Sequence, residues 1–252
     1  LYIILFKFLK KINYVYHHGH ALCQIPKLKS KLIINKYAVV LSFHQSMDIY
    51  WKSKGYKNIF VIGFPKFFHA WLNLINNLNN FEINEEYIVI YSRQADHAYY
   101  MTKENYFYLL TETYRCIRNE FDDIKIIIKP HPRENIKYIE EIMKSKNMKN
   151  IEVSYLNVAM LAKKAKFTIS FWSSAILDSF SFNIPGIEFY IETKKFRIVD
   201  PEGSLYKKLG IDSAQNYDEL EKIFKKIKNK KYIEPNIIKE FKNYKNLNIF
   251  YS

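Results

Sequence analysis

A histidine lies between two prolines and is flanked by two basic residues in the segment Lys129-Pro130-His131-Pro132-Arg133. The segment directly follows the apolar run Ile124–Ile128, which predicts a strand. The prolines stiffen the backbone and are expected to hold the imidazole outside the edge of a sheet, where open α/β folds bind ligands. With Lys129 and Arg133 beside it, His131 is a candidate clamp for a phosphate group. The alternative is a turn that only ends the strand and leaves its charged side chains in water.

Two adjacent serines, Ser173 and Ser174, follow a second short apolar run at Phe167–Phe171. Either serine could cap the next helix, and a helix N-terminus presents free N–H groups and a positive dipole end that suit a phosphate. Capping alone is a common role for such residues. The carboxyl ends of parallel strands open on the same edge of a sheet, so we expect these serines and His131 to hold one pyrophosphate from two sides.

Two further segments supply candidate side chains. Glu188, in the predicted strand Ile187–Tyr190, could accept hydrogen bonds from a ribose diol, or it could be an exposed strand residue. His18 lies in the segment Tyr16-His17-His18-Gly19-His20, where an imidazole that titrates near neutrality could act as a general base on an acceptor hydroxyl. Metal binding by this segment is the alternative. No carboxylate or fourth ligand of usual spacing accompanies these histidines, so no metal site is predicted.

The elements that must position these residues alternate along the chain between apolar strands and helical patterns. The expected strands are Ile12–Tyr16, Ala38–Phe43, Ile59–Ile62, Tyr87–Ser92, Ile124–Lys129, Phe167–Phe171 and Ile187–Tyr190. The expected helices are Phe67–Asn77, Lys103–Asn119, Asn135–Ser145, Val158–Lys164, Ser174–Phe182, Tyr217–Lys228 and Asn236–Lys245. This alternation is typical of α/β proteins with parallel sheets, and the near-continuous apolar strands indicate sheets covered on both faces.

We expect two Rossmann-like parallel-sheet domains that meet near residue 82. The polar stretch Asn76–Glu86 contains several asparagines and fits neither a strand nor a regular helix. Residues 1–81 would form an acceptor-side domain, and residues 82–252 would form a nucleotide-donor-binding domain with C-terminal helices. The first block offers three convincing strands and begins at Leu1, without a methionine, so the sequence predicts that this domain is truncated.

Composition limits the classes of partner and the compartment. The formal net charge is +14, but arginines are few and no nucleic-acid-binding motif is recognisable, so we expect solvated lysine-rich helix faces and no nucleic-acid partner. Peripheral contact with anionic lipid at the inner membrane face is left open. The apolar start of the chain is far shorter than the roughly 20 residues of a membrane-spanning helix. Cys23 and Cys116 are isolated from each other, which fits a cytoplasmic protein.

Taken in order, five segments resemble the capsule and teichoic-acid polymerase group of GT-B glycosyltransferases, which includes the CDP-glycerol glycerophosphotransferases. The His-Pro and Ser-Ser motifs are also similar to those of bacterial sialyltransferases and polysialyltransferases. The resemblance covers about residues 14–190. Its segments are His18-Gly19, Ile62-Gly63-Phe64-Pro65-Lys66, the strand Ile88–Ser92, Lys129-Pro130-His131-Pro132, and Ser173-Ser174 with Asn183-Ile184-Pro185.

The resemblance implies a transferase with a CMP- or CDP-linked donor and a saccharide or polyol-phosphate acceptor, and it implies no required cofactor. His131, Ser173 and Ser174 would bind the donor phosphate, with His131 stabilising charge on the departing nucleotide. His18 would be the general base. Lys129, Arg133 and Glu188 complete the candidate nucleotide-binding set.

The sequence departs from these family patterns at three points, which leaves donor and acceptor open. His20 replaces a threonine, and Phe64-Pro65-Lys66-Phe67 replaces an Asn-Pro-Arg-Asn motif of the glycerophosphotransferases. The acidic base motif of sialyltransferases is missing. An enzyme like UDP-N-acetylglucosamine 2-epimerase and a non-catalytic nucleotide-binding module of a polysaccharide assembly complex are the alternative functions.

Overall fold

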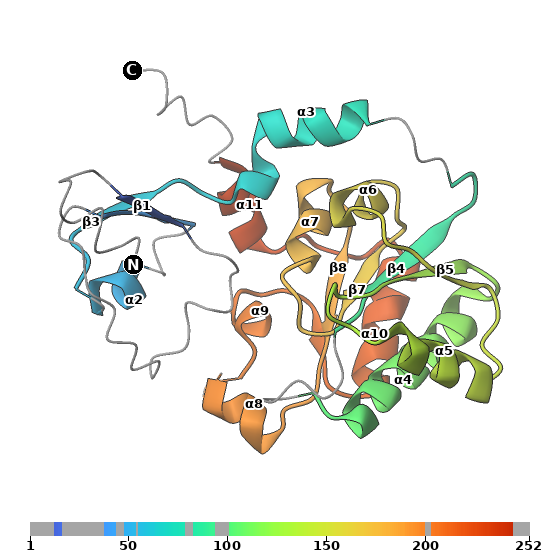
Figure 1. The fold of residues 1–252 in the computed structure, drawn as a ribbon. Helices are drawn as coiled ribbons and strands as arrows, with labels where there is room; N and C mark the ends of the chain where they lie inside the picture. The colour runs from blue at the N-terminus through green and yellow to red at the C-terminus, as the bar shows by residue number, and fades with distance from the viewer. Residues whose placement is uncertain are drawn as a thin grey trace. The chain divides into compact units, whose positions relative to one another are not determined.

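The chain is an α/β protein with two parallel sheets (Figure 1). The computed structural model describes residues 13–16, 38–43, 48–53, 55–78, 83–93, 101–199 and 203–243. The chain divides into two compact units, one of Leu1–Trp71 with Glu240–Ser252 and one of Leu72–Lys239. The predicted fold class is confirmed.

The first unit contains a three-stranded parallel sheet in the order β1-β2-β3. Its strands are β1 (Asn13–Tyr16), β2 (Ala38–Ser42) and β3 (Asn58–Val61), and helix α2 (Asp48–Ser53) lies between the last two in sequence. Ala38 and Val40 of β2 pack with Trp51 and Tyr56, whose rings meet edge to face at 5.3 Å. The alternating burial of β2 therefore puts one of its faces into an aromatic core.

The C-terminal helix α11 (Asn236–Asn243) ends among aromatic residues of the first unit. The ring of Phe241 lies 4.8 Å from that of Phe64 and 6.0 Å from that of Phe67, just before helix α3 (His69–Asn77). This packing explains why the end of α11, from Glu240 to Asn243, belongs to the first unit. The domain bounds 1–81 and 82–252 stay a prediction.

The second unit contains a six-stranded parallel sheet in the order β6-β5-β4-β7-β8-β9. Its strands are β4 (Tyr87–Tyr91), β5 (Lys125–Lys129), β6 (Ile151–Val153), β7 (Thr168–Ser170), β8 (Gly186–Phe189) and β9 (Ser213–Ala214). The central strand β4 comes first in the chain. The sheet then grows outward through β5 and β6 and, on the other side, through β7, β8 and β9. This is the strand order of a Rossmann-like fold, and it reverses between β4 and β7.

Helices cover both faces of the six-stranded sheet (Figure 1). One layer is formed by α4 (Lys103–Phe121), α5 (Ile136–Ser145) and α10 (Tyr217–Lys228), and the other by α6 (Val158–Ala162) and α7 (Ile176–Ser181). Two short helices, α8 (Lys194–Val199) and α9 (Leu205–Lys208), follow β8. None of the helices in the described residues is long and apolar enough to span a membrane.

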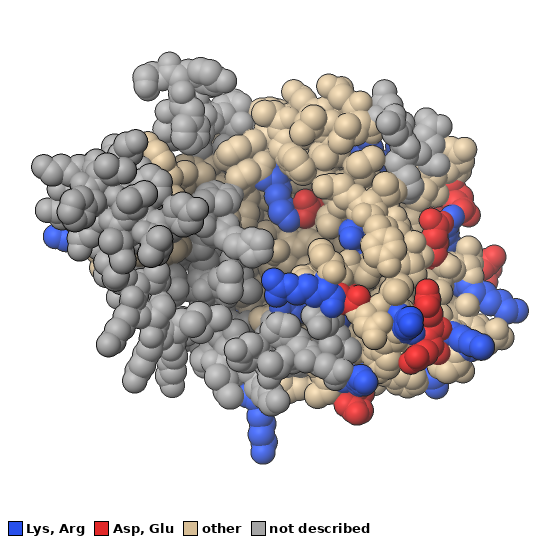
Figure 2. Space-filling view, viewed as in Figure 1, with Lys and Arg blue, Asp and Glu red and all other residues tan. Residues whose placement is uncertain are grey.

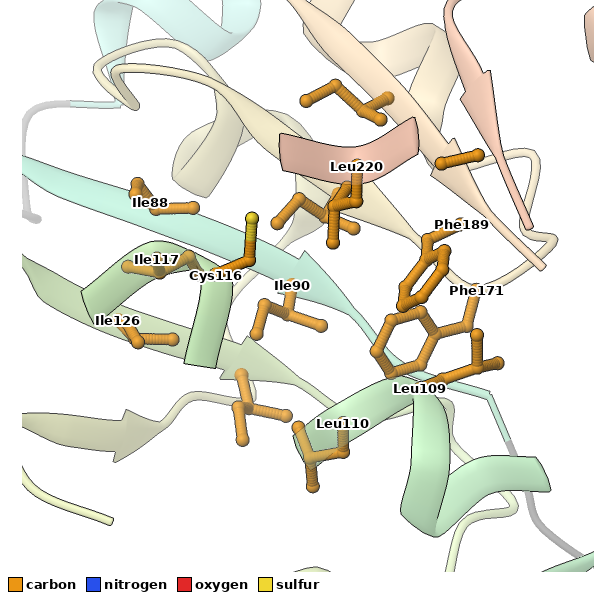
Figure 3. Close-up of a cluster of buried hydrophobic side chains, with 14 of the residues drawn as sticks. Ile88, Ile90, Leu109, Leu110, Cys116, Ile117, Ile126, Phe171, Phe189 and Leu220 are labelled. Atoms are coloured by element: carbon orange, nitrogen blue, oxygen red, sulfur yellow. The ribbon is translucent and has the colours of Figure 1, made fainter. Parts of the chain in front are cut away.

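The side chains of β4 alternate between these two layers. Ile88 and Ile90 join the cluster that Leu109, Cys116 and other residues of α4 form with α10 (Figure 3). On the opposite face, Tyr87, Val89 and Tyr91 pack with Leu161 and Ala165 beside α6. The predicted coverage of apolar strands on both faces is confirmed.

Candidate functional site

The candidate loops follow three neighbouring strands that end at the same level of the sheet. In the parallel register, Tyr91 of β4 pairs with Lys129 of β5 on one side and with Ser170 of β7 on the other. His131 therefore comes two residues beyond this level, and Ser173 comes three residues beyond it. The two loops share one edge, on either side of the central strand, as the sequence predicts.

The loop after β5 forms a tight turn that fixes the imidazole of His131. The Glu134 N–H donates to the His131 carbonyl oxygen at 2.8 Å, and the Arg133 N–H donates to His131 Nδ1 at 3.2 Å. Because Nδ1 accepts a hydrogen bond, the neutral ring carries its proton on Nε2. The side chain is partly exposed at the sheet edge and not part of the apolar interior. Its Nε2–H can therefore serve as a donor to an anionic oxygen.

Lys129 brings an ammonium group to the same loop. Its Nζ donates to the Pro130 carbonyl oxygen at 3.1 Å and lies 6.0 Å from the ring centroid of Tyr155, which is 70% exposed. Burial lowers the pKa of Lys129, and the nearby Glu134 carboxylate opposes this effect. An anion bound here would favour the charged lysine. Arg133 is exposed on the surface of the loop.

The carboxylate of Glu134 joins the loop to the end of β4. Its Oε2 accepts a 2.9 Å hydrogen bond from the His131 N–H, and its Oε1 accepts a 2.5 Å hydrogen bond from the Ser92 hydroxyl. Ser92 is 3% exposed, and its oxygen lies 2.6 Å from that of Tyr106. Burial raises the pKa of Glu134, while the hydrogen bonds from Ser92 and His131 oppose the rise. Sequence reasoning assigned no role to Ser92 or Glu134.

The loop after β7 is closed by Ser170. Its hydroxyl accepts from the Ser173 N–H at 2.8 Å and donates to the Ser173 carbonyl oxygen at 3.0 Å. The Ser173 hydroxyl accepts from the Ala175 N–H at 3.3 Å. The N-cap of α7 is Ala175, which makes no side-chain capping bond, so neither Ser173 nor Ser174 is the N-cap residue. The Ser173 hydroxyl instead stabilises the turn that leads into the helix, in which the carbonyl oxygens of Ser173 and Ser174 accept from the N–H groups of Ile176 and Leu177 at 3.2 Å.

Trp172 connects this loop to the end of β4. Its φ of 55° lies in the left-handed region, which bulky residues rarely adopt. Arg93 donates from Nη1 to the Trp172 carbonyl oxygen at 2.8 Å, and its guanidinium carbon lies 4.8 Å from the centroid of the indole ring. On α8, Phe196 packs on the same indole at 5.4 Å. Arg93 follows β4, where the strand order reverses, so its guanidinium is a further cation at this edge.

Glu188 lies in β8 and is 0% exposed, so the alternative of an exposed strand residue is wrong. Its Oε2 accepts from the hydroxyls of Ser204 at 2.5 Å and Ser213 at 3.0 Å. Ser204 is the N-cap of α9 and Ser213 lies in β9, so the carboxylate ties β8, α9 and β9 together. Binding of a ribose by Glu188 stays a prediction.

The histidine-rich segment lies outside the described residues. This holds for His18, the candidate general base, and for His17 and His20 on either side. Within the described part of the chain, no group of three or more His, Cys, Asp or Glu side chains is arranged to hold a metal ion.

Comparisons with known proteins establish the fold. No protein-family model matches the sequence, and neither does any curated protein. The UDP-GlcNAc 2-epimerase of Methanocaldococcus jannaschii aligns over 96% of this chain and 70% of its own, with a TM-score of 0.63 and 18% identity. The UDP-N-acetylglucosamine 2-epimerase of Rickettsia bellii aligns over 96% and 66%, with a TM-score of 0.63 and 17% identity.

The wall teichoic acid polymerase TagF is a third structure of similar fold. It aligns over 82% of this chain and 52% of its own, with a TM-score of 0.51 and 15% identity. The chain thus spans between 52% and 70% of the lengths of these three proteins. At such low identities the likeness shows the parallel α/β fold of GT-B enzymes and leaves the activity to the residues of the site.

Proposed function

We propose that this chain belongs to a GT-B transferase that moves a glycosyl or glycerophosphate unit from a CMP- or CDP-linked donor during synthesis of a surface polysaccharide. One observation carries the proposal. The loop with His131 and the loop with Ser173 lie at one edge of the sheet, on either side of β4. In Rossmann-like folds this edge is where nucleotides bind, at the point where the strand order reverses.

The donor phosphate would be bound by donors from both loops. The Nε2–H of His131 and the ammonium of Lys129 approach from one side, and Ser173 and Ser174 approach from the other. Cationic and hydrogen-bonding groups that are fixed in advance stabilise the negative charge that develops on a departing nucleotide. His18 is proposed as the base that takes the proton from the acceptor hydroxyl. The acceptor is proposed to be a saccharide or a polyol phosphate.

Ligands of the similar structures support a nucleotide donor. The Methanocaldococcus jannaschii epimerase was solved in complex with UDP-GlcNAc and UDP, and a TagF variant was solved after a soak with CDPG. Each of these ligands carries nucleotide phosphates, and the loops of His131 and Ser173 are proposed to bind a phosphate of the donor.

Surface charge supports a small anionic ligand over a nucleic acid. Figure 2 shows basic and acidic side chains intermingled over the described face of the second unit, without one continuous basic stripe. Several lysines of the second unit form ion pairs, such as Lys226 with Asp212 at 3.0 Å and Lys166 with Glu86 at 2.7 Å. Nucleic-acid-binding surfaces instead gather their cations along one face.

A UDP-N-acetylglucosamine 2-epimerase-like activity is the second candidate function. The two epimerases align over 96% of the chain with TM-scores of 0.63, against 82% and 0.51 for TagF. The proposed transferase donor carries cytidine and the epimerase substrate carries uridine, so the base that the protein selects separates the two activities. A non-catalytic nucleotide-binding module would bind the same ligands without turnover.

Calorimetric titration and thermal shift with CMP, CDP, UDP, UDP-GlcNAc and single-stranded RNA test the proposal. We expect stabilisation by cytidine nucleotides and a loss of about 10- to 100-fold in nucleotide affinity in His131→Ala, since one charge-assisted hydrogen bond contributes roughly 1.5–3 kcal/mol. The matched control is His69→Ala, which removes an exposed histidine of α3. Selective binding of uridine nucleotides would favour the epimerase. Binding of RNA alone would rule out both enzymes.

A further inference from the structure

A continuous set of contacts links the three loops at the sheet edge through Glu134. The carboxylate accepts from the His131 N–H at 2.9 Å and from the Ser92 hydroxyl at 2.5 Å. The residue after Ser92 is Arg93, which donates to the Trp172 carbonyl oxygen in the third loop at 2.8 Å. The backbone that presents His131 is therefore tied to the central strand by one side chain.

The geometry around Glu134 is reciprocal. Its own N–H donates to the His131 carbonyl oxygen at 2.8 Å, while its Oε2 accepts from the His131 N–H. These two hydrogen bonds fix both peptide groups of His131. The bond from the Ser92 hydroxyl to Glu134 Oε1 then anchors this pair of residues to the end of β4, and the Ser92 oxygen itself lies 2.6 Å from the hydroxyl of Tyr106.

A carboxylate at this position is unfavourable for the binding of an anion, because it lies beside the proposed phosphate site. Like charges repel, and burial further disfavours the ionised form, as the raised pKa of Glu134 indicates. A negative group three residues from His131 therefore weakens phosphate binding by its charge alone. Its hydrogen-bond geometry gives a compensating benefit, since two acceptors on one rigid group can hold two loops in register.

We propose that Glu134 is a positioning residue of the phosphate subsite, which fixes the backbone of His131 to the end of β4 so that Nε2 points to the donor phosphate. The inference rests on the proposed function, because it assumes that a nucleotide phosphate binds at His131. The side chain of Glu134 acts through His131 and does not contact the ligand.

Titration of the full chain with CMP and with cytidine tests the inference, and UMP with uridine serves as a second pair. Glu134→Ala should weaken CMP about tenfold, as expected for loss of hydrogen bonds to a fixed group, and should change cytidine affinity less than about twofold. Glu134→Gln should stay within about threefold of wild type for CMP. Its amide oxygen can still accept from His131, and its NH2 group can donate to Ser92, whose hydroxyl then turns to Tyr106. Glu141→Ala, an exposed glutamate of α5, is the control.

A double-mutant cycle separates positioning from general damage to the fold. In the His131→Ala background, Glu134→Ala should change CMP affinity by less than about twofold, because the residue through which it acts is gone. If Glu134→Ala does not fold, Ser92→Ala leaves the bond between Glu134 and His131 in place and removes the hydroxyl that joins Glu134 and Tyr106 at the end of β4, and it should weaken CMP selectively by about threefold.

The outcomes distinguish this inference from the proposed function. A loss of CMP affinity in His131→Ala without one in Glu134→Ala would overturn the positioning role and leave the function standing. The positioning role would also be overturned if Glu134→Ala reduced the affinities for CMP and cytidine equally. The same holds if Glu134→Ala reduced CMP affinity as much in the His131→Ala background as in the wild type. A wild-type chain that binds none of these nucleotides would remove the function and the inference together.

Discussion

The guanidinium of Arg93 lies over the indole ring of Trp172, 4.8 Å from its centroid, and donates from Nη1 to the carbonyl oxygen of the same residue at 2.8 Å. This pair connects the loops after β4 and β7, between which the strand order reverses. Trp172 has a φ of 55°, and this left-handed conformation costs roughly 1–2 kcal/mol for a residue with a Cβ. The contacts with Arg93 stabilise the loop against that cost.

Arg93→Lys is the first prediction. Lysine keeps the positive charge but cannot stack a planar group on the indole and donate to the carbonyl from the same side. We expect the Ser173 loop to loosen and nucleotide affinity, measured by calorimetry, to fall about tenfold. Arg115→Lys is a matched control, because Arg115 also stacks on an aromatic ring, that of Tyr217 at 4.0 Å. Unchanged affinity in Arg93→Lys would show that the pair does not hold the loop.

The second prediction concerns the pH dependence of stability at Glu134. Its pKa is raised because burial disfavours the carboxylate. A raised acid pKa gives stability that is complete below the ordinary carboxyl pKa of about 4.3 and is lost as the pH rises through the raised value. Glu134→Gln is neutral at every pH, so its Tm advantage over wild type should grow from pH 4 towards neutrality. Each kcal/mol corresponds to about 2–4 °C for a chain of this length.

Thermal melts of both proteins at several pH values between 4 and 8 measure this difference. Glu141→Gln makes the same substitution at an exposed position of α5 and is the control. A Tm difference between Glu134→Gln and wild type that is constant with pH would mean that Glu134 titrates alike in the folded and unfolded chain.

Lys129→Met is the third prediction, and we expect it to raise the stability of the fold slightly while it weakens nucleotide binding. Burial lowers the pKa of Lys129, so the charged form is slightly disfavoured in the folded chain at neutral pH. Because the group is partly exposed, we expect denaturant melts to show a stability gain of less than about 1 kcal/mol. Nucleotide affinity should fall about tenfold with loss of the ammonium. Lys144→Met on α5 is the exposed control, and higher nucleotide affinity in Lys129→Met would exclude a phosphate at this loop.

The sheet could be predicted from the sequence because its strands are short apolar runs buried on both faces. All seven predicted strands are found, and their ends differ by at most one residue. Two edge strands were missed. Strand β6 carries the exposed Glu152 between two apolar residues, and β9 contains only Ser213 and Ala214, so neither forms an apolar run. Edge strands depend on pairing with a neighbour more than on their own composition.

The sequence was sufficient to predict that the loops of the candidate site lie together, but it did not predict the hydrogen-bond partners of their side chains. Strand ends on a parallel sheet share an edge, which was enough to bring the loops of His131 and Ser173 together. The same rule applied to β4 would have pointed to Ser92 and Arg93. The partner of Ser92 is Glu134, 42 positions away, and such a contact leaves no local pattern in one sequence.

The burial of Glu188 also depends on residues that are distant in sequence. Its hydroxyl partners Ser204 and Ser213 lie 16 and 25 positions further along the chain. A buried carboxylate requires such donors, and the local sequence of β8 gives no sign of them.

Gly186 allows close approach between the start of β8 and helix α7, and it gives the last prediction. A Cβ at this position would lie 2.7 Å from Cγ1 of Ile176 and 3.0 Å from Cζ of Phe180, both buried on α7. Gly186→Ala must therefore push the helix away from the sheet, at a cost of about 1–3 kcal/mol in the free energy of unfolding. Because α7 directly follows the Ser173 loop, nucleotide affinity should fall as well.

A second substitution tests whether this steric contact is the cause. Ile176→Ala removes the nearest atom, so the loss of unfolding free energy in the double variant should be smaller than the sum of the single losses by about 0.5–3 kcal/mol. Gly210→Ala is the control, since a Cβ there meets nothing within 4 Å and its φ of +79° makes the cost one of backbone conformation alone. Ile176→Ala should not reduce the cost of Gly210→Ala. Additive losses for Gly186→Ala and Ile176→Ala in urea melts would mean that the helix accommodates the methyl group by another route and that the packing of α7 does not hold the Ser173 loop in place.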